Sequence, residues 1–265
     1  MTTDSDDPVE ANRKAWEQAA PYHRAHRHAD LLSSFARPGY SCLDDIATER
    51  LQALGVQGKA VAQLCCNNGR EVLSARNLGA ARGVGFDQAA AFIVQAQELA
   101  AAASVDCEFV AADVNRIAVE YDGAFDIVMV TIGVFGWMPD LNRFLGTAAR
   151  LLKPGGCFFA YEQHPIVEIY EPGEPEEALY SYFRREPFVE TESLDYYGNA
   201  EYEAETHYWF HHTLADILTG CIGHGLAIEH FQEYPNNISS ANMDVFENRT
   251  AQLPLSYTLV ARKAG

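Results

Sequence analysis

Polar residues follow four apolar segments of the chain, each at the point where the segment ends. A loop of small and polar residues, 65–69, follows the first segment. Asp87 follows the second, eighteen residues beyond Gly69, while Asp113 follows the third and Thr131 the fourth. In open parallel sheets, ligands bind at the carboxyl ends of the strands, where the strand order reverses. The loop lets backbone approach a ligand, Asp87 can accept two hydrogen bonds from a ribose diol, and Asp113 suits the exocyclic amine of a base.

Each of these residues also has a purely structural interpretation. Asp87 precedes a helical pattern, and aspartate in that position commonly caps the helix. Asp113 can cap a turn in the same way. For both aspartates, the correctly spaced first loop favours ligand binding. Cys65 and Cys66 are interpreted as packing residues rather than nucleophiles, because free cysteine behaves as a small hydrophobe.

His164 is the candidate general base. It follows a fifth apolar segment in Tyr161-Glu162-Gln163-His164-Pro165, and histidine is the usual base near neutral pH. The alternative is a histidine that only hydrogen-bonds the turn before Pro165.

Histidines and aromatic residues gather further along the chain. His207, His211 and His212 would suggest a metal site, but the intervening Tyr-Trp-Phe is typical of a strand, and no metal is expected. A second set either lines an aromatic pocket or builds the core of an insert; it comprises Trp137, Tyr196, Tyr197 and Trp209.

Alternating strands and helices must position these residues. Helices are expected at 69–78, 88–103 and 141–152, where apolar residues recur at helical spacing. Nearly continuous apolar runs indicate strands buried on both faces of a parallel sheet. The runs lie at 59–65, 81–86, 107–110, 125–130 and 157–162.

The flanking segments lack this alternation. Residues 12–50 have a helical pattern that Pro21 and the Pro38-Gly39 turn are expected to divide. Residues 165–206 are rich in Glu, Pro and Tyr and form an insert, in which 187–194 and 203–210 can pair as a hairpin. A helix at 213–223 and strands at 226–234 and 255–263 complete the expected elements. We therefore predict one domain over 1–265, with 1–50 as a helical cover and 165–206 as a substrate-side insert.

Charge excludes some classes of partner. Acidic residues number 37 and basic residues 19, giving a net charge of −18, which opposes binding to nucleic acid or an anionic membrane. The acidity after residue 160 would suit a cationic or neutral substrate, although solubility alone also explains it. No signal peptide is visible at the start of the sequence and none of the six cysteines forms a C-x-x-C pair, so we expect a cytoplasmic protein with reduced thiols.

Four motifs in this order resemble the class I methyltransferases that use S-adenosylmethionine (SAM) on small molecules. The first motif of that family usually reads V-L-D-L-G-C-G-x-G, and here it stands as Val-Ala-Gln-Leu-Cys-Cys-Asn-Asn-Gly over 61–69. The others are Gly-Val-Gly-Phe-Asp over 83–87, Phe-Val-Ala-Ala-Asp-Val over 109–114 and Leu-Leu-Lys-Pro-Gly-Gly over 151–156. The resemblance implies a Rossmann-like α/β fold. Its sheet would be seven-stranded and mostly parallel with an antiparallel last strand, with amino-terminal helices and an insert after the fifth strand.

The resemblance also implies roles for individual residues. Cys65, Asn67, Asn68 and Gly69 would hold the methionine part of SAM. Asp87 would bind the ribose, Asp113 with Val114 would bind the adenine, and Thr131 and Ile132 would line the floor. Gln88 would also belong to the cofactor site. Tyr22 and Arg27 would close over the carboxylate. The chain departs from the family pattern at Gln63, where a carboxylate is usual, and at Cys65 and Asn67, where glycines are usual.

The predicted function is methyl transfer from SAM to an oxygen, nitrogen or carbon nucleophile of a small molecule, by a monomer or homodimer. One alternative is a nicotinamide-dependent (NAD(P)) oxidoreductase, which would need G-x-G-x-x-G after the first strand. Another is a module that binds SAM without catalysis.

Overall fold

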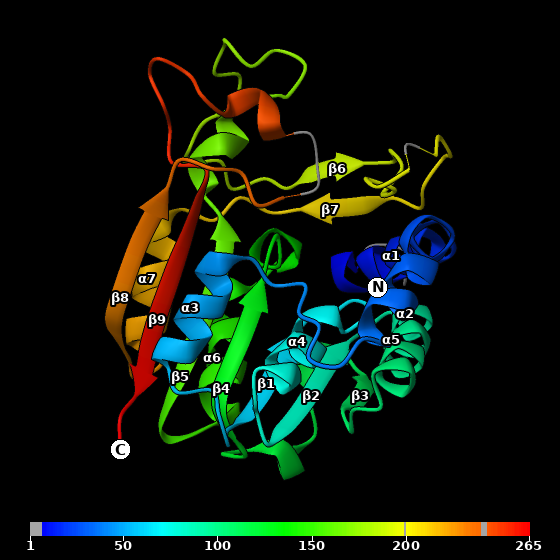
Figure 1. Ribbon diagram of the computed structural model, residues 1–265. Helices are drawn as coiled ribbons and strands as arrows, with labels where there is room; N and C mark the ends of the chain where they lie inside the picture. Colours follow the sequence, from blue (N-terminus) through cyan, green and yellow to red (C-terminus); the bar gives the residue numbers. More distant parts are fainter. Residues whose placement is uncertain (1–6, 199, 240–242) are drawn as a thin grey trace.

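A seven-stranded sheet forms the centre of the molecule in the computed structural model, which describes residues 7–198, 200–239 and 243–265 (Figure 1). The strand order is β3-β2-β1-β4-β5-β9-β8. Strands β1 to β5 run parallel, whereas β9 runs antiparallel between β5 and β8. This confirms the predicted sheet. The bounds are Ala60–Leu64 for β1, Arg82–Asp87 for β2, Glu108–Ala111 for β3, Phe125–Thr131 for β4, Leu152–Gln163 for β5, Leu226–Tyr234 for β8 and Ser256–Lys263 for β9.

Helices cover both faces of this sheet because the strands are apolar on both sides. In β4, for example, Val128 packs into one core cluster with α6 and α7, while Met129 packs into the other with α3, α4 and α5. The covering helices are α3 (Asp45–Ala53), α4 (Arg70–Asn77), α5 (Ala90–Ala103), α6 (Leu141–Leu151) and α7 (Leu214–Gly223), with short 3₁₀ turns η3 (Val114–Arg116), η4 (Val119–Tyr121), η5 (Phe135–Trp137), η6 (Pro165–Ile169) and η7 (Met243–Phe246).

The amino-terminal segment differs from the prediction at Pro21. Helix α1 (Pro8–His23) passes through Pro21 without ending there and continues as a π-helical turn, η2 (Arg24–His28), into α2 (Ala29–Phe35). The backbone N–H of Arg24 reaches the carbonyls of both Ala20 and Pro21, so the helix closes beyond the proline. The Pro38-Gly39 turn does end the segment, with Gly39 in the left-handed region at φ 74°.

The insert contains the predicted hairpin, although its strands are shorter than expected. Strand β6 (Phe188–Glu190) pairs antiparallel with β7 (His207–Trp209), with Phe188 opposite Trp209 and Glu190 opposite His207. In Figure 1 the hairpin lies across the edge of the sheet to which the parallel strands point, and its far end lies beside α1.

Side-chain amides join α1 to this hairpin. The buried amide of Asn12 accepts from the backbone N–H of Tyr208 at 2.7 Å and donates to the carbonyl of the same residue at 2.9 Å. Gln18 likewise accepts from the N–H of Glu205 and donates to the carbonyl of Glu203. Helix and hairpin therefore form one continuous cover over the strand ends. No helix in the described ranges is long and apolar enough to span a bilayer.

Candidate functional site

A cavity of about 450 Å³ opens at the carboxyl ends of the strands, beneath α1 and the hairpin. It lies where β1 and β4 are neighbours, at the reversal of strand order that favours ligand binding. The structure brings eight of the predicted site residues to its wall: Cys65, Asn67, Asp87, Gln88, Asp113, Val114, Thr131 and Ile132.

The first loop keeps a glycine-like backbone although two of its glycines are replaced. Cys65 and Asn67 lie in the left-handed region at φ 53° and 49°, as does Gly69 at 73°. Non-glycine residues adopt this region at a cost, with asparagine among the most tolerant. At Gly69 the requirement is also steric, because a Cβ there would lie 2.3 Å from the Phe109 ring. The departures from the family motif therefore change side chains while preserving the path of the loop.

Asp87 both supports the loop and faces the cavity. One carboxylate oxygen accepts from the backbone N–H of Asn67 at 2.8 Å and the other from that of Ala89 at 2.9 Å, in the turn before α5. Burial raises the pKa of Asp87 to about 6, and these backbone hydrogen bonds partly oppose the rise. The backbone N–H of Gln88 also contacts this carboxylate, and because a carboxylate offers about four lone-pair sites, Asp87 retains capacity for a ligand hydroxyl.

Asp113 also combines both interpretations. It caps η3 by accepting from the N–H of Asn115 at 2.9 Å, and it lies 3.4 Å from the Arg116 guanidinium. It lines the cavity together with Val114, whose side chain is buried.

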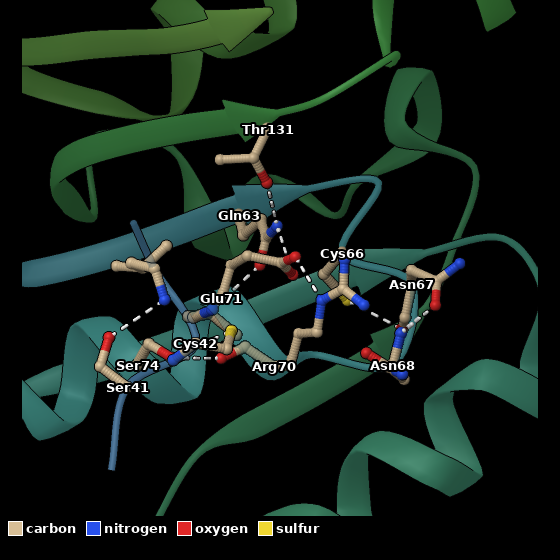
Figure 2. Close-up of polar contacts among 12 residues, drawn as sticks. Ser41, Cys42, Gln63, Cys66, Asn67, Asn68, Arg70, Glu71, Ser74 and Thr131 are labelled. Carbon is tan, nitrogen blue, oxygen red and sulfur yellow. Dashed lines mark hydrogen bonds and ion pairs between the residues drawn. The ribbon is translucent and has the colours of Figure 1, made fainter. Parts of the chain in front are cut away.

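Arg70 and Glu71 form a charged pair to which the sequence motifs give no role (Figure 2). The Arg70 Nε donates to the Glu71 carboxylate at 2.7 Å. The amide nitrogen of Gln63 donates to the Thr131 hydroxyl at 2.9 Å and lies 3.5 Å from the Glu71 carboxylate. Both charged residues line the cavity. Glu71, in the first turn of α4, thus brings a carboxylate next to position 63, where the family usually carries one. The sequence could have indicated this carboxylate, because Glu71 lies only two residues after Gly69 of the first motif.

The loop after β4 is held in a strained conformation beside the cavity. Ile132 has φ 47°, which is an outlier for a β-branched residue. The buried Glu162 carboxylate fixes the loop by accepting from the N–H groups of Gly133 at 2.6 Å and Val134 at 2.9 Å. Burial raises the pKa of Glu162 to about 7. Strain that is held by surrounding structure is frequent at functional sites.

Four predicted cofactor residues lie outside the cavity wall, as far as the described residues show: Tyr22, Arg27, Asn68 and Gly69. Tyr22 stacks on Tyr202, with ring centroids 4.3 Å apart, and the guanidinium of Arg27 lies 4.6 Å from the Tyr197 ring. Both side chains are thus directed onto the insert rather than into the cavity. Asn68 and Gly69 shape the first loop from behind, and Gly69 caps α4.

His164 is likewise not brought to the cavity. Its Nδ1 accepts from the backbone N–H of Ile166 at 3.1 Å, so Nε2 carries the proton in the neutral ring and donates to Glu233 at 3.0 Å. The ring is buried against Tyr257, and burial lowers its pKa. With both nitrogens engaged in η6 and β8, His164 fits the structural alternative of capping the turn at Pro165.

The four aromatic residues left undecided by the sequence all line the cavity: Trp137, Tyr196, Tyr197 and Trp209. They also pack together, since Trp137 meets Trp209 edge-on with centroids 5.1 Å apart. Trp209 rests on the loop after β4, where a Cβ on Gly136 would lie 2.2 Å from its ring. These aromatic residues therefore both line the cavity and pack against one another, so the two alternatives do not exclude each other.

The three histidines near β7 have separate partners. His207 lines the cavity, His211 contacts Glu168 at 2.8 Å, and the Nε2 of His212 lies 2.8 Å from the Met138 carbonyl. Within the described ranges, no three His, Cys, Asp or Glu side chains are grouped so as to hold a metal ion. All six cysteines are free, and burial raises the pKa of the Cys65 and Cys66 thiols, as expected of packing residues.

Part of the chain matches a known protein family. Residues 61–156 match the family model described as a methyltransferase domain. No curated protein sequence matches the chain.

Several solved structures share the fold. An S-adenosylmethionine-dependent methyltransferase from Mesorhizobium loti superposes with a TM-score of 0.56 at 19% identity, over 81% of this chain and 96% of that one. Magnesium protoporphyrin IX methyltransferase from Synechocystis, solved with bound SAM, superposes with a TM-score of 0.59 at 15% identity, over 99% of this chain and 100% of that one. Geranyl diphosphate C-methyltransferase from Streptomyces coelicolor superposes with a TM-score of 0.58 at 13% identity, over 83% of this chain and 79% of that one. At these identities the likeness concerns the fold.

Proposed function

We propose that the chain is a class I, SAM-dependent methyltransferase, since residues 61–156 match a methyltransferase domain, and that it methylates a small molecule held between the strand ends and the insert. One observation carries this proposal. A single cavity is lined on one side by the loops after β1, β2 and β4 and on the other by the hairpin and η6. Such a cavity has the size and mixed lining of a small-molecule site, which supports the proposal that SAM and an acceptor bind in it together.

The residues at the strand ends fit SAM. Asp87 has a lone pair available for the ribose, and Asp113 with the apolar Val114 suits the adenine. Glu71 and Arg70 offer opposite charges to the ammonium and carboxylate of the methionine end, in place of the proposed closure by Tyr22 and Arg27.

The protein's contribution to the reaction is alignment and exclusion of water. Bound SAM supplies a methyl group already activated by its sulfonium. The strained Ile132 loop and the Trp137–Trp209 pair line the cavity, and α1 and the hairpin cover it. Holding two reactants in line in a dry site accounts for much of the rate acceleration in such transfers. Since cover and strand ends share this cavity, we also propose that 1–265 acts as one domain.

Calorimetry with SAM, S-adenosylhomocysteine and NADPH tests the proposal. We expect saturable binding of the first two and none of NADPH, because the first loop lacks the G-x-G-x-x-G pattern. Binding of NADPH in preference to SAM would support the oxidoreductase alternative. Transfer of labelled methyl from SAM to any metabolite in an extract would then separate an enzyme from a non-catalytic binding module.

A further inference from the structure

The insert side of the cavity is acidic. Glu168, Glu171 and Glu190 line it, and among the described lining residues Arg70 is the only arginine or lysine. Arg70 is already paired with Glu71 on the opposite, strand-end side. The carboxylates of the insert therefore face the cavity without an arginine or lysine across from them among the described lining residues. Such a field attracts a cation and repels carboxylates and phosphates.

These carboxylates belong to one connected wall. In the hairpin, Glu190 lies opposite His207 and Phe188 opposite Trp209, and all four side chains line the cavity, whereas the intervening Val189 is exposed. Glu168 joins the same wall from η6, because it accepts hydrogen bonds from His211, at 2.8 Å, and from Trp209.

His207 supplies an independent indication of the missing ligand. Its Nδ1 lies 3.2 Å from the carbonyl oxygen of Glu205, which can only accept, so Nδ1 carries the proton in the neutral ring. Its Nε2 then has a free lone pair. That atom is buried and has no hydrogen-bond partner among the described residues, although a Glu190 oxygen lies 3.5 Å away. The side chain is 1% exposed and lines the cavity. A buried acceptor without a donor calls for a ligand that brings an N–H or O–H group.

Aromatic rings complete the wall. Trp209 and Tyr170 line the cavity next to Glu168 and its neighbours, and ring faces attract cations when water is excluded. Phe188 is less suited to this role, because the Arg184 guanidinium already lies 4.3 Å from its centroid. Acidic groups with aromatic faces match an ammonium group carried on an apolar stem.

We propose that the methyl acceptor is an amine, which enters as an ammonium ion and places its N–H groups against Glu168, Glu190 and the Nε2 of His207. This inference rests on the proposed function. The ammonium gives one proton to the Glu168 carboxylate, whose burial favours the protonated form. The nitrogen lone pair then forms the N–CH₃ bond as the S–CH₃ bond breaks, and the electron pair of that bond stays on sulfur. A methylated ammonium and a neutral thioether result, and Glu168 returns its proton to water.

Matched probes test the assignment. We expect protein saturated with S-adenosylhomocysteine to bind 2-phenylethylamine at least tenfold more tightly than 2-phenylethanol, and not to bind phenylacetate, in calorimetry at neutral pH. Glu168→Gln should weaken amine binding roughly tenfold to a hundredfold, the usual effect of losing a charge-assisted hydrogen bond. Glu186→Gln is the control, because Glu186 is an exposed acid of the same insert outside the cavity wall.

The outcomes separate this inference from the function on which it rests. If S-adenosylhomocysteine itself does not bind, the proposed function fails. If it binds but the alcohol binds as well as the amine, or neither probe binds, only the amine assignment fails. Should Glu168→Gln not fold, Glu190→Gln serves instead, since the Glu190 side chain is 49% exposed. An unchanged amine affinity in that variant would overturn the assignment.

Discussion

The two sides of the cavity are built in different ways. On the strand-end side, two carboxylates hold the backbone: Asp87 accepts from the N–H groups of Asn67 and Ala89, and Glu162 accepts from those of Gly133 and Val134. On the insert side, carboxylates contact other side chains, as Glu168 does with His211 and Trp209. The first arrangement fixes the path of the chain, which suits a ligand common to a whole family. The second fixes a local chemical environment, which suits a ligand particular to this protein.

The largest effect should come from adding one methyl group to the strand-end loop. Gly69→Ala would combine a left-handed backbone with a Cβ 2.3 Å from Phe109, lowering the free energy of unfolding by about 2–5 kcal/mol. Gly58→Ala is the matched control, because Gly58 has φ 75° but nothing within 4 Å of the added Cβ. Only the backbone cost of about 1–2 kcal/mol should remain there. Equal losses in urea denaturation would show that the loop has room to adjust.

Glu162 should make stability depend on pH. Its pKa is raised by burial to about 7 in the folded protein, against about 4.3 in an unfolded chain. The protonated folded form is therefore favoured below pH ~4.3, and this stabilisation is lost as the pH rises through 7. The contribution amounts to about 3–4 kcal/mol at full burial. Urea denaturation from pH 5 to 8 should show this decline in the native protein.

In Glu162→Gln the decline should be smaller, although one backbone N–H would lose its acceptor. Glu229→Gln is the control, because Glu229 lies on the surface in an ion pair with Arg262. Parallel pH profiles for the native protein and Glu162→Gln would remove Glu162 as the cause.

Asp87 should affect cofactor affinity without affecting the acceptor. Asp87→Ala is expected to weaken SAM binding by about 1.5–3 kcal/mol, the range for charge-assisted hydrogen bonds. Glu190→Gln, on the other side of the cavity, should leave SAM affinity unchanged. Calorimetry on variants whose folding is verified by circular dichroism measures both. If the two variants affect SAM alike, the division of the cavity into two sides is wrong.

The smallest effect concerns the cover. Asn12→Ala removes two hydrogen bonds to the Tyr208 backbone, a loss of about 1–2 kcal/mol, and should speed amide exchange in β7. Gln18→Ala should have less effect, because its bonds to 203 and 205 are exposed to water. In the native protein, S-adenosylhomocysteine with an acceptor should slow exchange in both 8–28 and 165–198. Unchanged exchange in both segments would contradict a mobile cover.

Much of the strand-end side could be predicted from sequence. The parallel strands, the loop at 65–69 and the positions of Asp87 and Asp113 follow from local patterns, because each side chain acts within a few residues of its own strand end. Local patterns do not indicate the direction of a side chain where a distant segment decides it. His164 follows a strand that leads to the cavity, yet Glu233 in β8 and the N–H of Ile166 hold its ring away from it.

The sequence by itself determined the alternation of buried strands and helices, and with it the edge of the sheet where a ligand binds, because hydrophobic periodicity is a local property of the chain. Tertiary structure alone decided the chemistry facing that edge. Glu168, Glu190 and His207 are separated by up to 39 residues in sequence, and no local pattern links them. They become neighbours in one wall because β6 and β7 pair and because Trp209 fits only against the bare backbone of Gly136.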